Sequence, residues 1–264
     1  MAYLRPKHVT CALLSSWVAL AGCGEPAPVA AVGVRGAAAL APPAVAGDSG
    51  AALPDRAARI AAAQRNGGPG YHFSRLMAPS GVAPVVTGTN AAQGFALELH
   101  RGVIQLRHDR GAALEAFDLQ WVRLGRQDCL VAVNPPRGGA LLTANRASWL
   151  RADGSEEWYL NGPLGLEQGF VVGTRPAGHG AHLILEIAVA GSVVPQLGPT
   201  GAAITLRRRA GEPVAHYGEL YAHDAAGAEL PAELEVAGQT IRLVVDDRGA
   251  PYPVTVDPLV WLDQ

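Results

Sequence analysis

Hydrophobic and polar residues alternate with a period of two along most of the chain after Tyr71. The alternation is clearest at residues 95–100, 117–124, 182–189, 233–236 and 241–246. Alternation of this kind is typical of β-strands that bury one face. Within the second of these segments, it predicts that Arg123 lies on the same face as Phe117 and Trp121.

Short segments rich in Gly and Asp separate the alternating runs. They are Asp109-Arg110-Gly111, Asp153-Gly154, Ala225-Ala226-Gly227 and Asp246-Asp247-Arg248-Gly249. Each is typical of a hairpin turn. A helical pattern precedes them, in which Ala57 to Gln64 are strong helix formers and Asn66-Gly67-Gly68 ends the helix. The sequence therefore predicts an all-β protein: a large antiparallel β-sandwich with one short N-terminal helix.

The first residues form a secretory signal. Arg5 and Lys7 make it positive, an apolar run covers residues 9–19, and Leu20-Ala21-Gly22-Cys23 follows. That ending resembles the lipobox of bacterial lipoproteins, in which the signal is cut before the cysteine and the cysteine is acylated. An ordinary cleaved signal is the alternative, whereas a transmembrane helix needs about 20 apolar residues.

The lipobox divides the chain into three expected regions. They are a signal peptide at residues 1–22, a flexible tether rich in Ala, Pro and Gly at residues 23–52, and the β-sandwich with its leading helix at residues 53–264. The tether lacks large apolar side chains that would offset the entropy of ordering it, so we expect it to be disordered.

Lipid on Cys23 makes the membrane a partner. Gly24 is not the aspartate that retains enterobacterial lipoproteins in the inner membrane, so we expect an outer-membrane location in a bacterial cell envelope.

Composition argues against several functions. The 264 residues include 21 Lys and Arg and 23 Asp and Glu, and loss of Arg5 and Lys7 changes the net charge from −2 to about −4. A weakly acidic chain has no electrostatic footprint for nucleic acid. Lys7 is the only lysine in the sequence, so the mature chain has no amine for a Schiff base or a phosphate-binding loop.

His179 and His182 lack further ligands in a recognised pattern, so we expect no metal and no cofactor. Cys129 is expected to be buried and to form no disulfide, because Cys11 leaves with the signal and Cys23 carries lipid.

Two segments resemble a known family. They are Glu157–Phe170 (EWYLNGPLGLEQGF) and Tyr252–Val260 (YPVTVDPLV). Together they are similar to segments of the β-rich N-terminal module of large bacterial surface proteins, in which the module precedes a β-propeller of FG-GAP (integrin-α-like) or related repeats. The resemblance covers residues 53–260 and implies no catalytic residues. No propeller sequence follows before Gln264, so propeller functions such as calcium binding do not transfer. A stand-alone module, a truncated copy and one part of a split gene all stay open.

The first of these segments also holds a candidate binding loop. Its residues are Trp158, Tyr159, Asn161, Glu167 and Gln168, which supply stacking and hydrogen-bonding groups suited to a sugar. The alternative is a structural turn that the aromatic residues hold against the sandwich. Because neighbouring strand residues face opposite sides, we predict that one of Trp158 and Tyr159 is buried and the other is exposed or partly covered.

Two hypotheses about function follow. The first is a membrane-tethered cell-envelope lipoprotein that acts as a structural or binding module, with a saccharide or an envelope protein as its partner. It is not an enzyme, because the sequence has no nucleophile elbow, calcium loop, phosphate loop or zinc-helix motif. The second is a divergent carbohydrate-active enzyme on a β-sandwich, with carboxylates near Glu167 and Asp257. A concave site in which two carboxyls converge would favour the second hypothesis.

Overall fold

The structure is a computed structural model that describes residues 56–65, 67–76, 84–100, 102–109 and 114–262. These residues belong to one compact unit that spans Pro43–Gln264. The expected signal peptide (1–22), the expected tether (23–52) and Cys23 lie outside the described residues. None of the helices within the described ranges is long and apolar enough to cross a membrane.

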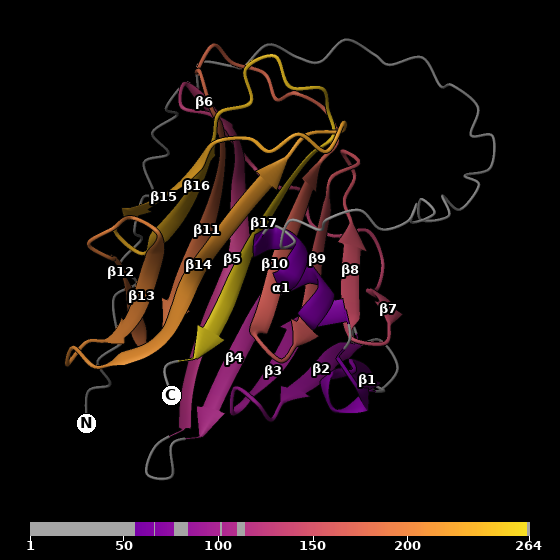
Figure 1. Ribbon diagram of the computed structural model, residues 1–264, viewed down its shortest axis with the longest axis vertical. Coiled ribbons are helices and arrows are strands. Elements are labelled where there is room, and N and C mark those ends of the chain that lie inside the picture. Colours follow the sequence, from indigo (N-terminus) through magenta and orange to yellow (C-terminus); the bar gives the residue numbers. More distant parts are fainter. Residues whose placement is uncertain (1–55, 66, 77–83, 101, 110–113, 263–264) are drawn as a thin grey trace, which may run out of the picture. The chain divides into compact units, whose positions relative to one another are not determined.

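Two antiparallel β-sheets make up most of the described chain (Figure 1). The first sheet contains, in spatial order, β1 (Ser74–Leu76), β2 (Val85–Asn90), β3 (Phe95–His100), β4 (Val103–Asp109), β5 (Leu114–Arg126), β11 (Leu183–Gly191), β16 (Thr240–Val245) and β15 (Ala232–Ala237), and β6 (Cys129–Ala132) pairs with β5. The second sheet contains β12 (Val193–Leu197), β13 (Ala203–Arg208), β14 (Pro213–His223), β17 (Val254–Leu262), β10 (Gly165–Val172), β9 (Glu156–Gly162), β8 (Arg146–Leu150) and β7 (Leu141–Thr143). The predicted all-β antiparallel sandwich is confirmed.

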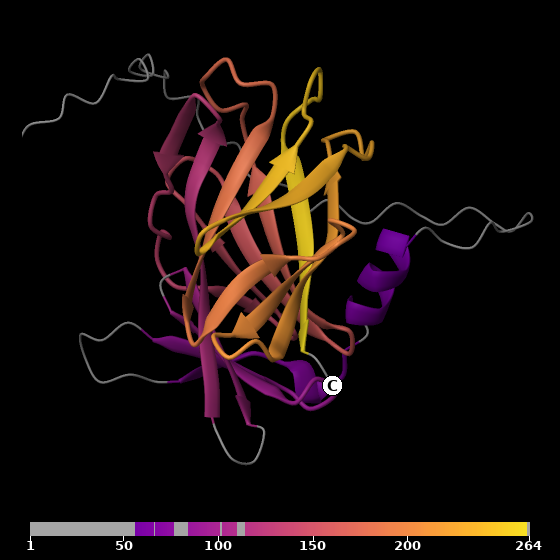
Figure 2. The same ribbon diagram turned by 90° about the vertical axis from the view of Figure 1, so that its left-hand side faces the viewer.

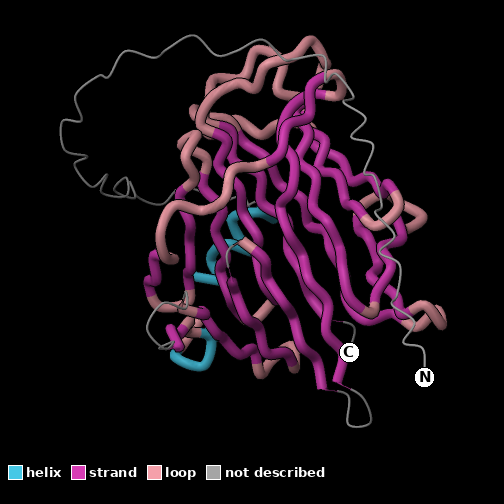
Figure 3. Tube along the Cα trace, turned by 180° about the vertical axis from the view of Figure 1, so that it is seen from behind, coloured by secondary structure: helices cyan, strands magenta, loops and turns pink. Residues whose placement is uncertain are grey.

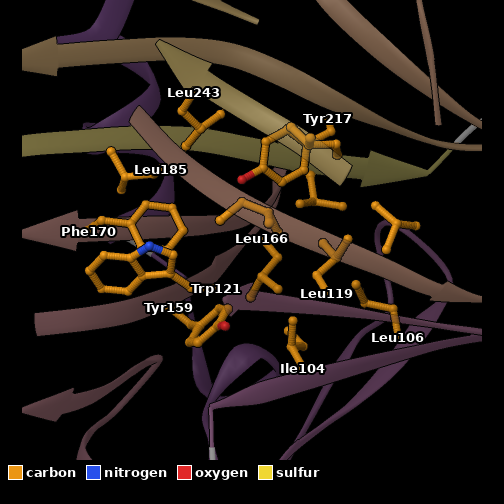
Figure 4. Close-up of a cluster of buried hydrophobic side chains, with 14 of the residues drawn as sticks. Ile104, Leu106, Leu119, Trp121, Tyr159, Leu166, Phe170, Leu185, Tyr217 and Leu243 are labelled. Atoms are coloured by element: carbon orange, nitrogen blue, oxygen red, sulfur yellow. The ribbon is translucent and has the colours of Figure 1, made fainter. Parts of the chain in front are cut away.

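The hydrophobic core lies between the two sheets, where alternate residues of their strands meet (Figure 4). The ring of Trp121 on β5 contacts the ring of Phe170 on β10 edge-on, with 5.0 Å between centroids and 67° between planes. Leu166 of β10 and Leu119 of β5 are both fully buried. The hydrophobic residues of the alternating segments therefore face the core that the two sheets share.

A β-bulge interrupts the alternation of β5. Ile187 of β11 lies opposite Trp121, whereas Glu186 lies opposite Arg123, so Val122 is an extra residue in the ladder. Trp121 is buried and Arg123 is exposed. The prediction that these two residues share a face is wrong, because the extra residue reverses the alternation beyond it.

Two of the expected hairpin turns connect the sheets instead. Asp153-Gly154 does join β8 to β9 within one sheet. In contrast, Ala225-Ala226-Gly227 leads from β14 in the second sheet to β15 in the first, and Asp246-Asp247-Arg248-Gly249 leads from β16 in the first sheet to β17 in the second. Local turn chemistry is the same in both cases, so it does not indicate which sheet receives the next strand. The turn at 109–111 falls partly outside the described residues.

The predicted helix is present as α1 (Arg56–Arg65), followed by a short 3-10 helix at Pro69–Tyr71. Figures 1 and 2 show α1 beside the second sheet, on the side away from the first, and Figure 3 shows it behind the strands of the first sheet. Gln64 fixes the end of α1 to the turn between β9 and β10. Its Nε2 donates to the carbonyl of Gly165 at 3.1 Å, and its Oε1 accepts from the amide of Leu164 at 3.0 Å.

Cys129 begins β6 and is 8% exposed, so its predicted burial is confirmed. It is disulfide-bonded, which corrects the expectation that it forms no disulfide. That expectation assumed that signal cleavage and acylation remove both other cysteines as partners. Both other cysteines, Cys11 and Cys23, lie outside the described residues.

Candidate functional site

A cavity of about 490 Å³ lies between α1 and the outer face of the second sheet. Strands β8, β9, β10, β14 and β17 form its floor and walls, because outward-facing residues on adjacent strands come side by side. The polar and aromatic residues that line it are Arg65, Arg146, Trp158, Glu167, Glu219, Tyr221, His223, Thr255 and Asp257. Side chains of α1, among them Ile60, lie on its remaining side.

A pair of acidic side chains, Glu167 on β10 and Asp257 on β17, lies in this cavity. Glu167 is opposite Leu259 in the β10–β17 ladder, and Asp257, two residues from Leu259, is its diagonal neighbour on the same face. Oε1 of Glu167 and Oδ1 of Asp257 are buried, and neither has a hydrogen-bond partner among the described residues. The two sequence segments that carry the family resemblance thus lie side by side and supply one carboxyl each.

Burial changes the protonation of this carboxyl pair. It raises the pKa of Glu167 to about 7, although the charges of Arg65 and Arg146 act in the opposite direction. Burial also raises the pKa of Asp257 well above its ordinary value, and the nearby charge of Glu167 raises it further. Since two close carboxylates resist ionising together, the pair retains a proton at neutral pH. It can therefore donate one hydrogen bond and accept others.

Trp158 forms a wall of the cavity. One face of its ring packs on Gly169 of β10, where an added Cβ would lie 1.9 Å from Cε2 of the ring. The guanidinium of Arg146 lies 4.5 Å from the ring centroid. The side chain is consequently buried, with the residue only 7% exposed. A sugar ring could stack on Trp158 only if Arg146 moved aside.

Strand β14 forms the opposite wall. The rings of Tyr221 and His223 are half-buried and lie 5.7 Å apart. The pairing of β14 with β17 shifts between Gly218 and Tyr221, and within this bulge Glu219 adopts a φ of 52°. Such a backbone angle is uncommon for a residue with a Cβ. Bulges of this kind redirect side chains beside functional sites, and here Glu219 lines the cavity.

The five residues of the candidate binding loop lie in a buried β-hairpin formed by β9 and β10. Trp158 and Glu167 face the cavity, Tyr159 and Gln168 face the core, and Asn161 lies near the end of the hairpin. Trp158 and Tyr159 do face opposite sides. The prediction that one of them is exposed or partly covered is wrong, because both faces of the sheet are covered at this point. An exposed loop of all five residues is not what the chain forms.

Tyr159 and Gln168 belong to a polar network inside the core. Oη of Tyr159 donates to Oε1 of Glu157 at 2.6 Å, and Nε2 of Gln168 donates to the same oxygen at 3.2 Å. Oη of Tyr217 donates to Oε1 of Gln168 at 3.0 Å, and Arg151 pairs with the other oxygen of Glu157. The polar groups of Glu157, Tyr159 and Gln168 are satisfied within this network, so these are structural residues rather than ligand contacts. Only Nε of Arg151 among the atoms of this network is buried without a hydrogen-bond partner in the described part of the chain.

Asn161 joins the end of the hairpin to neighbouring segments. Its Oδ1 accepts from Nδ2 of Asn90 at 2.9 Å, and its Nδ2 donates to the carbonyls of Tyr71 at 3.0 Å and Thr89 at 2.9 Å. With both ends of its amide occupied and the residue fully buried, Asn161 fits the structural interpretation of this segment.

Sequence reasoning considered Glu167 and Asp257 but missed Arg146, Glu219 and Tyr221 as cavity residues. Arg146 comes from β8, two strands before β10 along the chain. Glu219 and Tyr221 come from β14, which is far from Glu167 in sequence and reaches the cavity through the order of strands in the sheet. The spacing of Tyr221 and His223 indicates one strand face. Nothing in the sequence indicates that this face meets Asp257.

No family model matches the chain, and no curated protein or solved structure is detectably similar to it. Across the described ranges, no three His, Cys, Asp or Glu side chains form a group that could hold a metal ion.

Proposed function

We propose that this chain is a lipid-anchored cell-envelope protein whose β-sandwich binds a saccharide in the cavity beneath α1. The carboxyl pair is the observation that carries the proposal. Two buried carboxyl oxygens without a partner, one on Glu167 and one on Asp257, line a space of about 490 Å³. Buried polar groups in proteins are nearly always paired, so a ligand that supplies hydrogen-bond donors fits these oxygens.

Sugar hydroxyls match the chemistry of this cavity. A hydroxyl both donates and accepts, as does a carboxyl pair that retains one proton. The charges in the lining also nearly balance, since Arg65 and Arg146 face Glu167, Glu219 and Asp257. A nearly balanced cavity with an aromatic wall at Tyr221 favours an uncharged polar ligand over an ion.

Calorimetric titration of the full chain in a zwitterionic, sugar-free detergent tests the proposal. The probes are soluble oligosaccharides of N-acetylglucosamine, glucose and mannose. Glu167→Gln and Asp257→Asn should each weaken binding by about fivefold or more, because each removes a hydrogen bond between the carboxyl pair and the ligand, worth about 1 kcal/mol for a neutral carboxyl and about 1.5–3 kcal/mol for a charged one. Glu212→Gln changes an exposed glutamate outside the cavity lining and should leave affinity unchanged.

Two results would overturn the proposal. One is a wild-type protein that binds none of the probes. The other is a pair of carboxyl variants that remain folded and bind as tightly as the wild type. The lipid anchor is tested separately by mass spectrometry of the N-terminal peptide for acyl chains on Cys23.

A second candidate function is glycoside hydrolysis, which the convergence of Glu167 and Asp257 in one cavity favours. Glycosidases use two carboxyls, one protonated and one ionised. The protonated member would give its proton to the leaving glycosidic oxygen, and the ionised member would take a proton from the water that attacks the sugar. Release of new reducing ends by the wild type, lost in Asp257→Asn, would support hydrolysis. Binding without release would leave the binding module as the function.

A further inference from the structure

A second cavity adjoins the first along β14. It has a volume of about 350 Å³ and lies between β14, β15, the turn that joins β12 to β13, and Ile60 of α1. Ile60, Glu219 and Tyr221 line both cavities. The bulge of β14 at Glu219 thus forms the border between two neighbouring spaces on the same side of the molecule.

An aromatic side chain lies at the far side of the second cavity. Trp261 of β17 lines it, and its ring stacks on His216 of β14 with 5.3 Å between centroids and 21° between planes. Trp261 is four residues from Asp257, so both point to the outer face and lie roughly 13 Å apart along the strand. That span is longer than one hexose ring.

Small residues keep the space beside the bulge open. Gly218, on the outer face, lies opposite Ala203 in the β13–β14 ladder. A Cβ on Gly218 would come within 2.9 Å of the Cβ of Ala203. Ala202 and Gly201 border the second cavity from the turn. Larger side chains at these positions would narrow the passage beside Glu219.

The charges of the second cavity select among saccharides. Glu219, Glu229 and Glu233 line it, and no Arg or Lys is among its lining residues. Carboxylates accept hydrogen bonds from hydroxyls and repel acidic sugars. An uncharged chain fits this side of the groove, whereas a chain of uronic acids does not.

We propose that the two cavities are neighbouring subsites of one groove that takes an uncharged linear oligosaccharide rather than a single sugar. One end of the chain is held by Glu167 and Asp257, and a later sugar ring stacks on Trp261. This inference rests on the proposed saccharide binding and specifies the length and charge of the ligand.

The test is a series of titrations of the full chain with N-acetylglucosamine and glucose oligomers of one to six residues. Wild-type affinity should rise at least tenfold from the monomer to the longer chains. Trp261→Ala should abolish most of this rise while the affinity for the monomer stays within about twofold. Leu197→Ala removes an exposed apolar side chain outside the lining of both cavities and serves as the control.

A second variant guards against loss of folding. Ala202 is exposed in the turn, and Ala202→Phe fills the second cavity from outside without removing a packed side chain. It should abolish the rise with chain length in the same way as Trp261→Ala. Affinity that does not change with length, or variants that weaken every length equally, would overturn the extended groove and leave saccharide binding intact. No binding at any length would overturn the proposed function itself.

Discussion

Replacement of Glu167 by Gln should stabilise the protein at neutral and alkaline pH and remove part of its pH dependence. Glu167 is 2% exposed, and its pKa rises from 4.5 to about 7 on folding, chiefly through burial. Below about pH 4.5 the group is protonated in both states, so it makes no difference to stability. As the pH rises from 4.5 towards 7, the unfolded state ionises first, and the folded state becomes less favoured.

The size of the effect follows from the change in pKa. A difference of 2.5 pH units at about 1.36 kcal/mol per unit gives a penalty of about 3 kcal/mol that is complete above pH 7. For a domain of this size, about 3 kcal/mol corresponds to roughly 6–12 °C in Tm. Gln keeps the shape of Glu167 and cannot ionise, so Glu167→Gln should unfold at a higher temperature than the wild type at pH 8 and at a similar temperature at pH 4.5.

The assay is thermal unfolding by circular dichroism at several pH values between 4.5 and 8, with Glu212→Gln as the exposed control. Other carboxyls also titrate in this range, so the measured quantity is the difference in Tm between each variant and the wild type. If the plots of Tm against pH for Glu167→Gln and the wild type were parallel across the whole range, the reasoning would be refuted. Glu167 would then have the same pKa in the folded protein as in water.

Three further outcomes are expected. Trp158→Ala and Tyr159→Ala should each lose about 3–5 kcal/mol in unfolding free energy, measured by urea denaturation, because both side chains are buried; near-neutral behaviour of either would contradict the packing described above. Gly169→Ala should lower the Tm by several degrees because its Cβ would collide with the ring of Trp158, whereas Gly173→Ala, whose nearest neighbour would be 3.5 Å away, should not. Cys23→Ser should release the protein from the membrane fraction or stall its processing, and mature-sized protein that still sediments with membranes would rule out the lipid anchor.

The sequence was a reliable guide to the fold because strand alternation is local. A residue such as Leu97 faces the core because its neighbours two positions away do, and no distant contact is needed to predict this. The alternation fails as a guide where the pairing of a strand with a distant strand changes which way its residues face. Arg123 departs from the pattern because of a bulge that depends on β11, and the segment 246–249 crosses between sheets although its residues would also suit a hairpin.

The site was much harder to predict from the sequence because it is built across strands. Glu167 and Asp257 are 90 positions apart, and only the antiparallel pairing of β10 with β17 makes them neighbours. Tyr221 reaches them from β14 on the other side of β17. Residue type suggested Glu167 and Asp257 as carboxyls of interest. The expected turn at Asp153-Gly154 pairs β8 with β9, but it does not indicate that Arg146 lies over the ring of Trp158 and buries it.

The hairpin of β9 and β10 carries acidic residues on both faces, and the contrast between them bears on function. Glu157 faces the core, where Tyr159, Gln168 and Arg151 satisfy both of its oxygens. Burial raises the pKa of both acids, but only Glu167 faces the cavity with an unpartnered oxygen. Its rise to a pKa of about 7 predicts a stability cost of about 3 kcal/mol at neutral pH, a large part of a total that is typically about 5–15 kcal/mol. A glutamine at that position would avoid the charge, and an apolar residue would avoid the unpaired group. A stability cost of this size at a cavity wall is typical of binding and catalytic residues, which are selected for what they contact and not for what they contribute to folding. Glu157 therefore has the characteristics of a structural acid, and Glu167 those of a ligand-binding one.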